Sequence, residues 1–337
     1  MTIGQSLLSP LGWIYGSVSF LRARAYRAGL LKQRRLNGTV ISVGNLTTGG
    51  TGKTPMVLWI AQRLLEEGKR PGILTRGYRG NFSSSPGETG LPDSTSDEVK
   101  LLKARLGESV AFGVGPDRFA RGSELARQDV KWFVLDDGFQ HLALARDVDI
   151  VLLDATNPFG GGHLLPAGRL REPRSALARA DVVVVTRANS SPAIEAAIRR
   201  DFNGPIFYAR PRLESIVDCA TGKAASEAFF GSEECFAFCG IGNPDAFVAN
   251  LKEWGISVAG SRFFRDHHRY TQRDISDIQA EARRSGAKVA MCTEKDVFNL
   301  PSSGWQGLRL LYCRIALEVD KGDEFWAFLS ERARSRS

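Results

Sequence analysis

Short runs of large apolar residues recur along the chain, and amphipathic stretches with helical spacing lie between them. The runs are rich in β-branched and aromatic residues, as expected for buried strands, and the stretches carry apolar residues on one helical face. The predicted strands are 39–43, 72–75, 110–112, 132–135, 150–153, 182–185, 235–238, 289–292 and 308–312, and the predicted helices include 55–67, 97–105, 117–127, 245–254 and 272–284. This alternation predicts an α/β fold with a mainly parallel sheet flanked by helices.

The N-terminal segment departs from this pattern. No side chain from Thr2 to Phe20 is charged, many are large and apolar or aromatic, and six basic residues follow: Arg22, Arg24, Arg27, Lys32, Arg34 and Arg35. A signal peptide carries its positive charge before the apolar run, so we expect the segment to be retained. Its Ser, Gly, Gln and Pro10 make a bilayer span marginal. An in-plane helix with the basic cluster on anionic headgroups, and a helix packed on the enzyme's own core, both remain open.

A glycine-rich loop follows the first predicted strand. The residues Gly49, Gly50, Thr51, Gly52, Lys53 and Thr54 lie between strand 39–43 and helix 55–67. Glycines allow backbone N–H groups to surround phosphates, Lys53 can reach the β- and γ-phosphates of ATP, and the Thr54 hydroxyl can bind Mg²⁺. Thr47 stands where the strict motif has its first glycine. The sequence still predicts a P-loop NTPase-like core.

Two carboxylates end another predicted strand. Asp136 and Asp137 follow the apolar run 132–135 directly. Open α/β sheets bind ligands at the carboxyl ends of their strands, and P-loop enzymes hold Mg²⁺ with an acidic residue there. We therefore expect Asp136 and Asp137 to hold the metal, either directly or through water.

Basic loops and histidines provide further candidates. Arg76 and Tyr78 follow one strand and Arg171 lies in another loop, so the two arginines could bind the phosphates of ATP or of an acceptor. The run Asp266-His267-His268 is compatible with a metal cluster, a general base or a polar turn.

Composition limits the class of protein. The 337 residues, 43% of them hydrophobic, suffice for one large or two ordinary domains, and the formal charge of +8 indicates an anionic partner. Basic residues are not interleaved with stacking aromatics, so no nucleic acid is expected as a partner. The five cysteines lack metal-site spacing and indicate reduced core residues in the cytoplasm. We predict an N-terminal membrane-associated segment at 1–36, a P-loop kinase core at 37–195 and a smaller C-terminal α/β part at 196–337.

Several motifs in order resemble the tetraacyldisaccharide 4'-kinase family, the lipid A 4'-kinases of Gram-negative bacteria, over nearly the full length. The segments that carry the resemblance are 42–45, 49–55, 75–78, 136–141, 165–168, 170–173, 240–244, 266–267 and 293–296. The family's N-terminal membrane helix with its basic residues also agrees with this chain.

The resemblance implies transfer of the ATP γ-phosphate to the 4'-hydroxyl of tetraacyldisaccharide 1-phosphate, at the cytoplasmic face of the inner membrane and in contact with its lipids. It also implies that Asp97 and His267 form the catalytic base, although Ser96 and Val99 stand where the family has Gly and Pro. A carboxylate beside an imidazole can accept the proton of a sugar hydroxyl.

Two other functions remain to be tested. A soluble P-loop GTPase or metallochaperone would use the segment 293–296 to read the base, but this segment lacks the guanine signature Asn-Lys-x-Asp. A two-metal phosphoesterase would rest on the segment 266–268 alone and lacks further Asp and His clusters.

Overall fold

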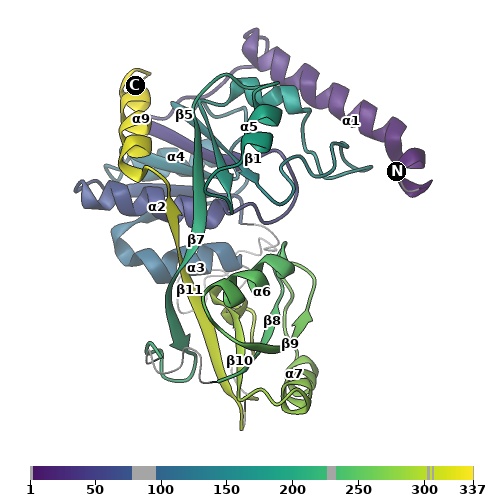
Figure 1. The fold of residues 1–337 in the computed structure, drawn as a ribbon. Helices are drawn as coiled ribbons and strands as arrows, with labels where there is room; N and C mark the ends of the chain where they lie inside the picture. Colours follow the sequence, from purple (N-terminus) through teal and green to yellow (C-terminus); the bar gives the residue numbers. More distant parts are fainter. Residues whose placement is uncertain (1–2, 78–95, 226–232, 302–303, 306, 337) are drawn as a thin grey trace. The chain divides into compact units, whose positions relative to one another are not determined.

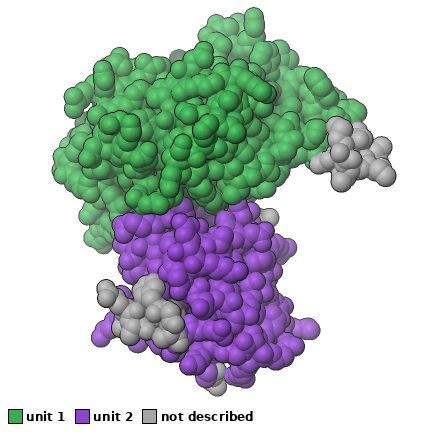
Figure 2. All heavy atoms as spheres, in the orientation of Figure 1, with its two compact units in different colours: residues 1–94, 102–210, 317–337 green, residues 95–101, 211–316 purple. Residues whose placement is uncertain are grey.

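The computed structural model describes residues 3–77, 96–225, 233–301, 304–305 and 307–336. The chain forms two compact units, shown in green and purple in Figure 2. Unit 1 comprises residues 1–94, 102–210 and 317–337, and unit 2 comprises residues 95–101 and 211–316. The predicted functional division at residues 36 and 195 stays a prediction, because the units describe compactness alone. The C-terminal residues belong to unit 1 because helix α9 (Gly322–Arg334) packs on strands β1 and β5.

Unit 1 contains a sheet in the order β3-β2-β4-β1-β5-β6-β7. Every pairing between neighbouring strands of this order is parallel. The strands are β1 (Thr39–Asn45), β2 (Pro71–Thr75), β3 (Ala111–Val114), β4 (Trp132–Asp136), β5 (Val148–Asp154), β6 (Val182–Thr186) and β7 (Ile206–Asp218), the last of which continues into unit 2. The carboxyl ends of β2, β4 and β1 therefore lie next to one another.

Helices cover both faces of this sheet, as Figure 1 shows. Along β5, Ile150 and Leu152 pack in a core with α2 and α9, whereas Val151 and Leu153 pack in a second core with Leu177. Alternate residues of a strand point to opposite faces, so a strand buried on both sides is apolar throughout. The helices are α2 (Lys53–Glu66), α4 (Arg118–Ala126), η1 (Gly107–Ser109), η2 (Arg174–Arg179), α5 (Pro192–Ile198) and α9, and α3 (Asp97–Leu106) begins in unit 2.

The N-terminal helix α1 (Ile3–Arg27) belongs to unit 1 and turns its small residues inward. Gly12 and Gly16 are buried among residues 8–27, for which the structure describes burial, and a Cβ atom at Gly16 would lie 2.4 Å from Leu164 Cδ1. Its large apolar side chains, including Leu11, Trp13 and Ile14, are exposed. Within the described residues, no helix has the length and apolar character needed to cross a bilayer.

Unit 2 contains the strand order β7-β11-β10-β8-β9. Its strands are β8 (Cys235–Cys239), β9 (Val258–Phe263), β10 (Val289–Thr293) and β11 (Arg309–Val319), and its helices are α6 (Pro244–Glu253), α7 (Gln272–Arg284) and α8 (Glu294–Val297). Phe236 and Phe238 of β8 pack in the core with α7. The alternate residues Cys235, Ala237 and Cys239 pack with α6. The mainly parallel α/β fold with a smaller C-terminal part is confirmed.

The sequence analysis did not predict strands β7 and β9 or helices α5 and α9. The middle of strand β7 alternates exposed and half-buried residues, and its exposed residues are Arg210, Arg212 and Glu214, so it lacks a continuous apolar run. The residues of β9 are exposed or half-buried, since it is the last strand of its sheet order. Polar strands of this kind give a weak signal in hydropathy because the backbone pairing, and not burial, defines them.

Candidate active site

The glycine-rich loop in unit 1 connects the buried strand β1 to helix α2. The side-chain amide of Asn45 donates to the Thr47 carbonyl at 2.7 Å and to the Thr51 hydroxyl oxygen at 2.9 Å, inside the loop. Gly52 has φ 87° and immediately precedes α2, a left-handed conformation that glycine adopts without strain. The loop is therefore fixed from within and ends at a helix N-terminus, where N–H groups and the helix dipole favour an anion.

Two neighbouring segments hold the loop from outside. The Thr186 hydroxyl donates to the Thr51 carbonyl at 3.1 Å, and Arg187 Nη2 donates to the Gly50 carbonyl at 3.0 Å. On the other side, Arg169 Nε donates to the Thr48 carbonyl at 3.1 Å. Gly49 has φ 116°, a backbone conformation that residues with a side chain rarely adopt, so this position favours glycine. These contacts preorganise the phosphate loop.

The acidic end of β4 faces the same loop. The Nζ atom of Lys53 lies 3.6 Å from Asp137 Oδ1, and Arg171 Nη1 donates to both carboxylate oxygens of Asp137 at 2.8 Å. Asp136 accepts from the Thr75 hydroxyl at 3.3 Å, at the adjacent end of β2. The structure thus brings Lys53, Asp136, Asp137 and Arg171 together, a set that the sequence placed in three separate loops.

The charges around Asp137 keep it ionised. Burial by itself would raise the pKa of Asp137, but the Lys53 and Arg171 cations hold the pKa below its usual range. The donors offered here by Thr54, Asp136 and Asp137 are all hydroxyl or carboxylate oxygens, the type that Mg²⁺ prefers. The set therefore fits a magnesium ion.

Arg118 is a buried cation beside this cluster that the sequence analysis missed. It is only 6% exposed, and its Nε atom has no hydrogen-bond partner among the described residues. Burial and the Arg76 charge lower the pKa of Arg118, whereas Asp137 and Asp136 act in the opposite direction. A guanidinium in this position adds to the positive charge available to a phosphate.

A second cluster lies in unit 2, where α3 begins. The Nδ1 atom of His267 lies 2.9 Å from Asp97 Oδ1 and 3.0 Å from Oδ2, although the two residues are 170 positions apart. His267 has φ 60°, a left-handed conformation that is uncommon outside glycine and that is found disproportionately at functional sites. The structure therefore brings together the two residues that the resemblance paired.

In the pair formed by Asp97 and His267, the Asp97 carboxylate is ionised. Burial by itself would raise the pKa of Asp97, but the hydrogen bond with His267 and the Lys295 charge hold the pKa well below its usual range. The hydrogen bond with Asp97 raises the pKa of His267, against the effects of burial and Lys295. Asp97, Glu98 and His267 also offer atoms within 4.8 Å of one another that could hold a metal ion. The Lys295 ammonium, 2.9 Å from Glu98, already supplies a positive charge there.

The remaining predicted residues take different places. Thr51 is buried inside the loop, and Thr54 lies in the first turn of α2. Arg76 is exposed directly after β2, where its charge acts on Arg118. Tyr78 lies outside the described residues.

Sequence reasoning missed Arg118, Arg187 and Lys295 as candidates. All three follow parallel strands closely: Arg118 after β3, Arg187 after β6 and Lys295 after β10. In parallel α/β sheets the segments after the strands collect at the ligand-binding edge. Arg187 and Lys295 lie two and three residues after the predicted strands 182–185 and 289–292, so a scan for charged residues there would have found both. Arg118 lies six residues after the predicted strand 110–112, and such a scan would have missed it.

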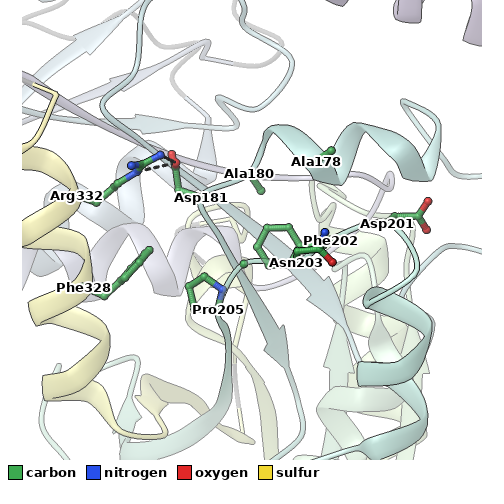
Figure 3. A pocket seen from close by; sticks show the side chains of 10 residues that line it. Ala178, Ala180, Asp181, Asp201, Phe202, Asn203, Pro205, Phe328 and Arg332 are labelled. Atoms are coloured by element: carbon green, nitrogen blue, oxygen red, sulfur yellow. Dashed lines mark hydrogen bonds and ion pairs between the residues drawn. The ribbon is translucent and has the colours of Figure 1, made fainter.

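A shallow cavity of about 420 Å³ lies elsewhere in unit 1 (Figure 3). It is lined by residues before β6 and β7, including Asp181 and Pro205, and by Phe328 and Arg332 of α9. Asp181 and Arg332 form an ion pair at 2.8 Å. Because β1, β5, β6 and β7 are parallel, this cavity is at the amino ends of the strands, the edge opposite to the phosphate loop.

Comparisons with known proteins agree on one family. The family profile described as tetraacyldisaccharide-1-P 4'-kinase matches residues 4–334. A Geobacter metallireducens protein named tetraacyldisaccharide 4'-kinase is 39% identical over 310 residues, which are 88% of this chain and 88% of that protein. A Pelobacter propionicus protein of the same name is 41% identical over 301 residues, covering 86% of this chain and 82% of that protein.

A solved structure has the same fold. A crystal structure of LpxK from Aquifex aeolicus, described as an "apo" form in complex with ATP, is 28% identical to this chain. The match has a TM-score of 0.72 and covers 97% of this chain and 99% of the other. The similarity therefore extends over the fold of the whole chain.

Proposed function

The chain belongs to the tetraacyldisaccharide-1-P 4'-kinase family, and we propose that it transfers the γ-phosphate of ATP to the 4'-hydroxyl of tetraacyldisaccharide 1-phosphate. The product is the bisphosphorylated lipid A precursor, lipid IVA. The observation that carries this proposal is the phosphate loop with Lys53 beside Asp137 and Arg171. The relatives are named as kinases, so the GTPase or metallochaperone alternative is not favoured.

ATP is the phosphate donor, and its triphosphate binds to the loop 49–54. Lys53 pairs with the β- and γ-phosphates and spreads the charge that develops during transfer. Thr54, Asp136 and Asp137 would hold Mg²⁺, which supplies charge neutralisation on the phosphate oxygens when bound. We assign these roles to residues of the predicted core 37–195. The catalytic base combines Asp97 of this core with His267 of the predicted C-terminal part 196–337.

Asp97 accepts the proton of the attacking hydroxyl, and His267 orients it. The contacts between His267 Nδ1 and both Asp97 oxygens, at 2.9 and 3.0 Å, support this assignment. An ionised carboxylate in a buried site is a competent base once the hydroxyl is held within hydrogen-bond distance. Positioning supplies much of the rate in phosphoryl transfer, so the fixed geometry of the pair contributes directly.

Arg76, Tyr78 and Arg171 are the proposed contacts to the phosphorylated lipid. Arg76 is exposed, and Arg171 has part of its side chain accessible while it pairs with Asp137. A guanidinium binds a phosphate through two parallel hydrogen bonds, which also fixes its orientation.

Helix α1 attaches the enzyme to the inner-membrane lipids at the cytoplasmic face. Its outward surface carries exposed Leu11, Trp13, Ile14, Val18 and Leu21, which is the reverse of an ordinary surface helix. Exposed basic residues follow this surface at 22, 24 and 27. Apolar side chains inserted among acyl chains, with cations on anionic headgroups, are the design of an interfacial helix.

Transfer of radiolabelled γ-phosphate to the lipid tests the proposed function directly. The wild-type enzyme with ATP, Mg²⁺ and tetraacyldisaccharide 1-phosphate in detergent micelles should give labelled lipid. Lys53→Ala should abolish the label, and Lys252→Ala should not, because Lys252 is an exposed lysine of α6 in unit 2. Failure to label the lipid, with hydrolysis of GTP instead, would revive the nucleotide-switch alternative.

Flotation with vesicles tests the membrane attachment separately. The wild type should float with vesicles containing anionic phospholipid, and replacing Trp13 and Ile14 by serine should reduce the bound fraction several-fold. The double variant should lose much less of its activity on micellar substrate than of its binding to vesicles. Equal flotation of the wild type and the double variant would contradict the proposal that α1 attaches the enzyme to the membrane.

A further inference from the structure

The segment Thr293-Glu294-Lys295-Asp296 has no role in the function proposed above, yet it delivers a lysine to the acid–base pair. Lys295 Nζ lies 2.9 Å from Glu98 Oε1, 3.7 Å from Asp97 Oδ2 and 3.7 Å from Asp266 Oδ1. The side chain is 21% exposed, so its charge is only partly screened by water. One ammonium thus touches three carboxylates from two segments of unit 2.

Buried hydrogen bonds fix the short helix that carries Lys295. Thr293 and Asp296 form a capping box at the start of α8. The Asp296 carboxylate, 1% exposed, also accepts from the Gly240 N–H and the Tyr270 hydroxyl, both at 2.8 Å. Because four donors hold Asp296, the backbone beside it cannot shift without breaking buried hydrogen bonds. Lys295 is consequently presented from a rigid base.

The charges that face His267 show why a cation is needed there. Its Nδ1 contacts Asp97, and its Nε2 lies 3.5 Å from Glu98 and 3.8 Å from Asp266. Three carboxylates around one imidazole favour the imidazolium, and a permanently protonated His267 would weaken Asp97 as a base. Among the charged groups that the structure describes around the pair, Lys295 is the cation that opposes this effect.

We propose that Lys295 is a positioning residue that sets the protonation state of the Asp97–His267 pair, so that the imidazole is neutral when the acceptor hydroxyl arrives. The ammonium neutralises part of the carboxylate charge and keeps Asp97 ionised. It does so without contacting substrate phosphate itself, unlike Lys53. This role rests on the assignment of Asp97 and His267 as the base.

Histidine NMR of the full-length enzyme tests the electrostatic part without any assay of activity. The chain has only four histidines, so each ring can be assigned by single substitution. In Lys295→Met, the pKa of His267 should rise by about one unit, because a cation within contact distance of the cluster has been removed. Lys295→Arg should restore most of the wild-type value, and Lys288→Met, at an exposed lysine just before β10, should leave it unchanged.

The pH profile of lipid phosphorylation tests the catalytic part. The acidic limb of kcat in Lys295→Met should move to higher pH by the same amount, with a similar plateau and an unchanged KM for ATP. An unmoved pKa of His267 overturns the inference, as does a uniform loss of kcat at every pH. If the pKa of His267 moves but the limb does not, Lys295 tunes the pair as inferred and the base assignment of the proposed function fails.

Discussion

The two lysine–carboxylate clusters of this enzyme place the same residue types in opposite charge environments. Lys53 meets Asp137 at 3.6 Å in unit 1, and Lys295 meets Asp97 at 3.7 Å in unit 2. Around Asp137 there are three cations, Lys53, Arg171 and Arg118, and the neighbouring Asp136. Around Lys295 there are three carboxylates. The roles proposed for the two clusters, phosphate binding and proton acceptance, therefore rest on the balance of charge around each lysine and not on the lysine itself.

The helix N-termini near the two lysines also stand beside different anions. The Lys53 cluster lies at the end of a phosphate loop whose helix N-terminus adds further positive potential. The Lys295 cluster lies at the start of α3, with Asp97 and Glu98 in its first turn, so that the helix dipole stabilises the carboxylates. Each helix end thus favours the anion at its own cluster, phosphate in one case and carboxylate in the other.

Lys53→Ala should have the largest effect, a loss of about 10³-fold in kcat for phosphoryl transfer. The substitution removes the cation proposed to act on the transferring phosphate and leaves Asp137 with Arg171 and Arg118. Initial rates with saturating ATP measure the loss. Lys53→Met should behave like Lys53→Ala, since a neutral side chain of similar length restores packing and not charge. Activity within tenfold of wild type in either variant would contradict the role of this cluster.

Asp97→Asn should lower kcat by about 10²-fold and leave the KM for ATP unchanged. The amide keeps the shape of the side chain and can still meet Asn299 and His267, but it cannot accept the hydroxyl proton. Together with Lys53→Ala, this variant separates the clusters by their kinetic signatures. If Asp97→Asn raised the KM for ATP instead of lowering kcat, the carboxylate would belong to nucleotide binding.

The contrast between the clusters also governs what the sequence could predict. Strand β1, its loop and α2 are consecutive, so the glycines, Lys53 and Thr54 are recognisable from local order alone. Asp97 and His267 are 170 residues apart, and each by itself looks ordinary: Asp97 is an acid at a helix start and His267 is in a polar turn. Only the family resemblance paired them.

The sequence analysis missed Lys295 and Arg118 as site residues for a related reason. Their importance comes from the strand order, which brings the ends of strands that are distant in sequence to one edge. The strands themselves were mostly visible as apolar runs. The order of the strands in the sheet determines which charged residues lie next to one another. This order depends on long-range pairing, which hydropathy does not reveal.

As the pH rises through the pKa of His267, activity should increase and the stability of the fold should decrease. The hydrogen bond with Asp97 raises the pKa of His267 in the folded protein, so the protonated pair stabilises the fold at pH below the unfolded value near 6.5. This stabilisation is lost as the pH rises through the raised folded pKa, while kcat increases because the imidazole becomes neutral. Urea unfolding and initial rates measured over the same pH range check the two signs.

His267→Gln is the variant that sharpens this pH prediction. It should remove both the acidic limb of kcat and the stability change in that window, with a smaller loss of kcat than Asp97→Asn. Near the Lys53 cluster, burial and the Arg118 charge lower the pKa of His141 to about 4, so the KM for ATP should change little over this range. An acidic limb that persists in His267→Gln would assign the titration to another group.

Asn299→Ala should have the smallest effect, a roughly threefold to tenfold decrease in kcat, because it removes one hydrogen bond to the base. The Asn299 amide donates to Asp97 Oδ2 at 3.2 Å, and its backbone is held by Asp296 and Tyr270, so the fold of α8 should survive. Asn299→Asp is the informative partner, because it adds a carboxylate beside Asp97. It should raise the pKa of His267 and move the acidic limb of kcat to higher pH. If Asn299→Asp and Asn299→Ala gave the same profile, charge balance would not control this cluster, and its difference from the Lys53 cluster would be one of geometry alone.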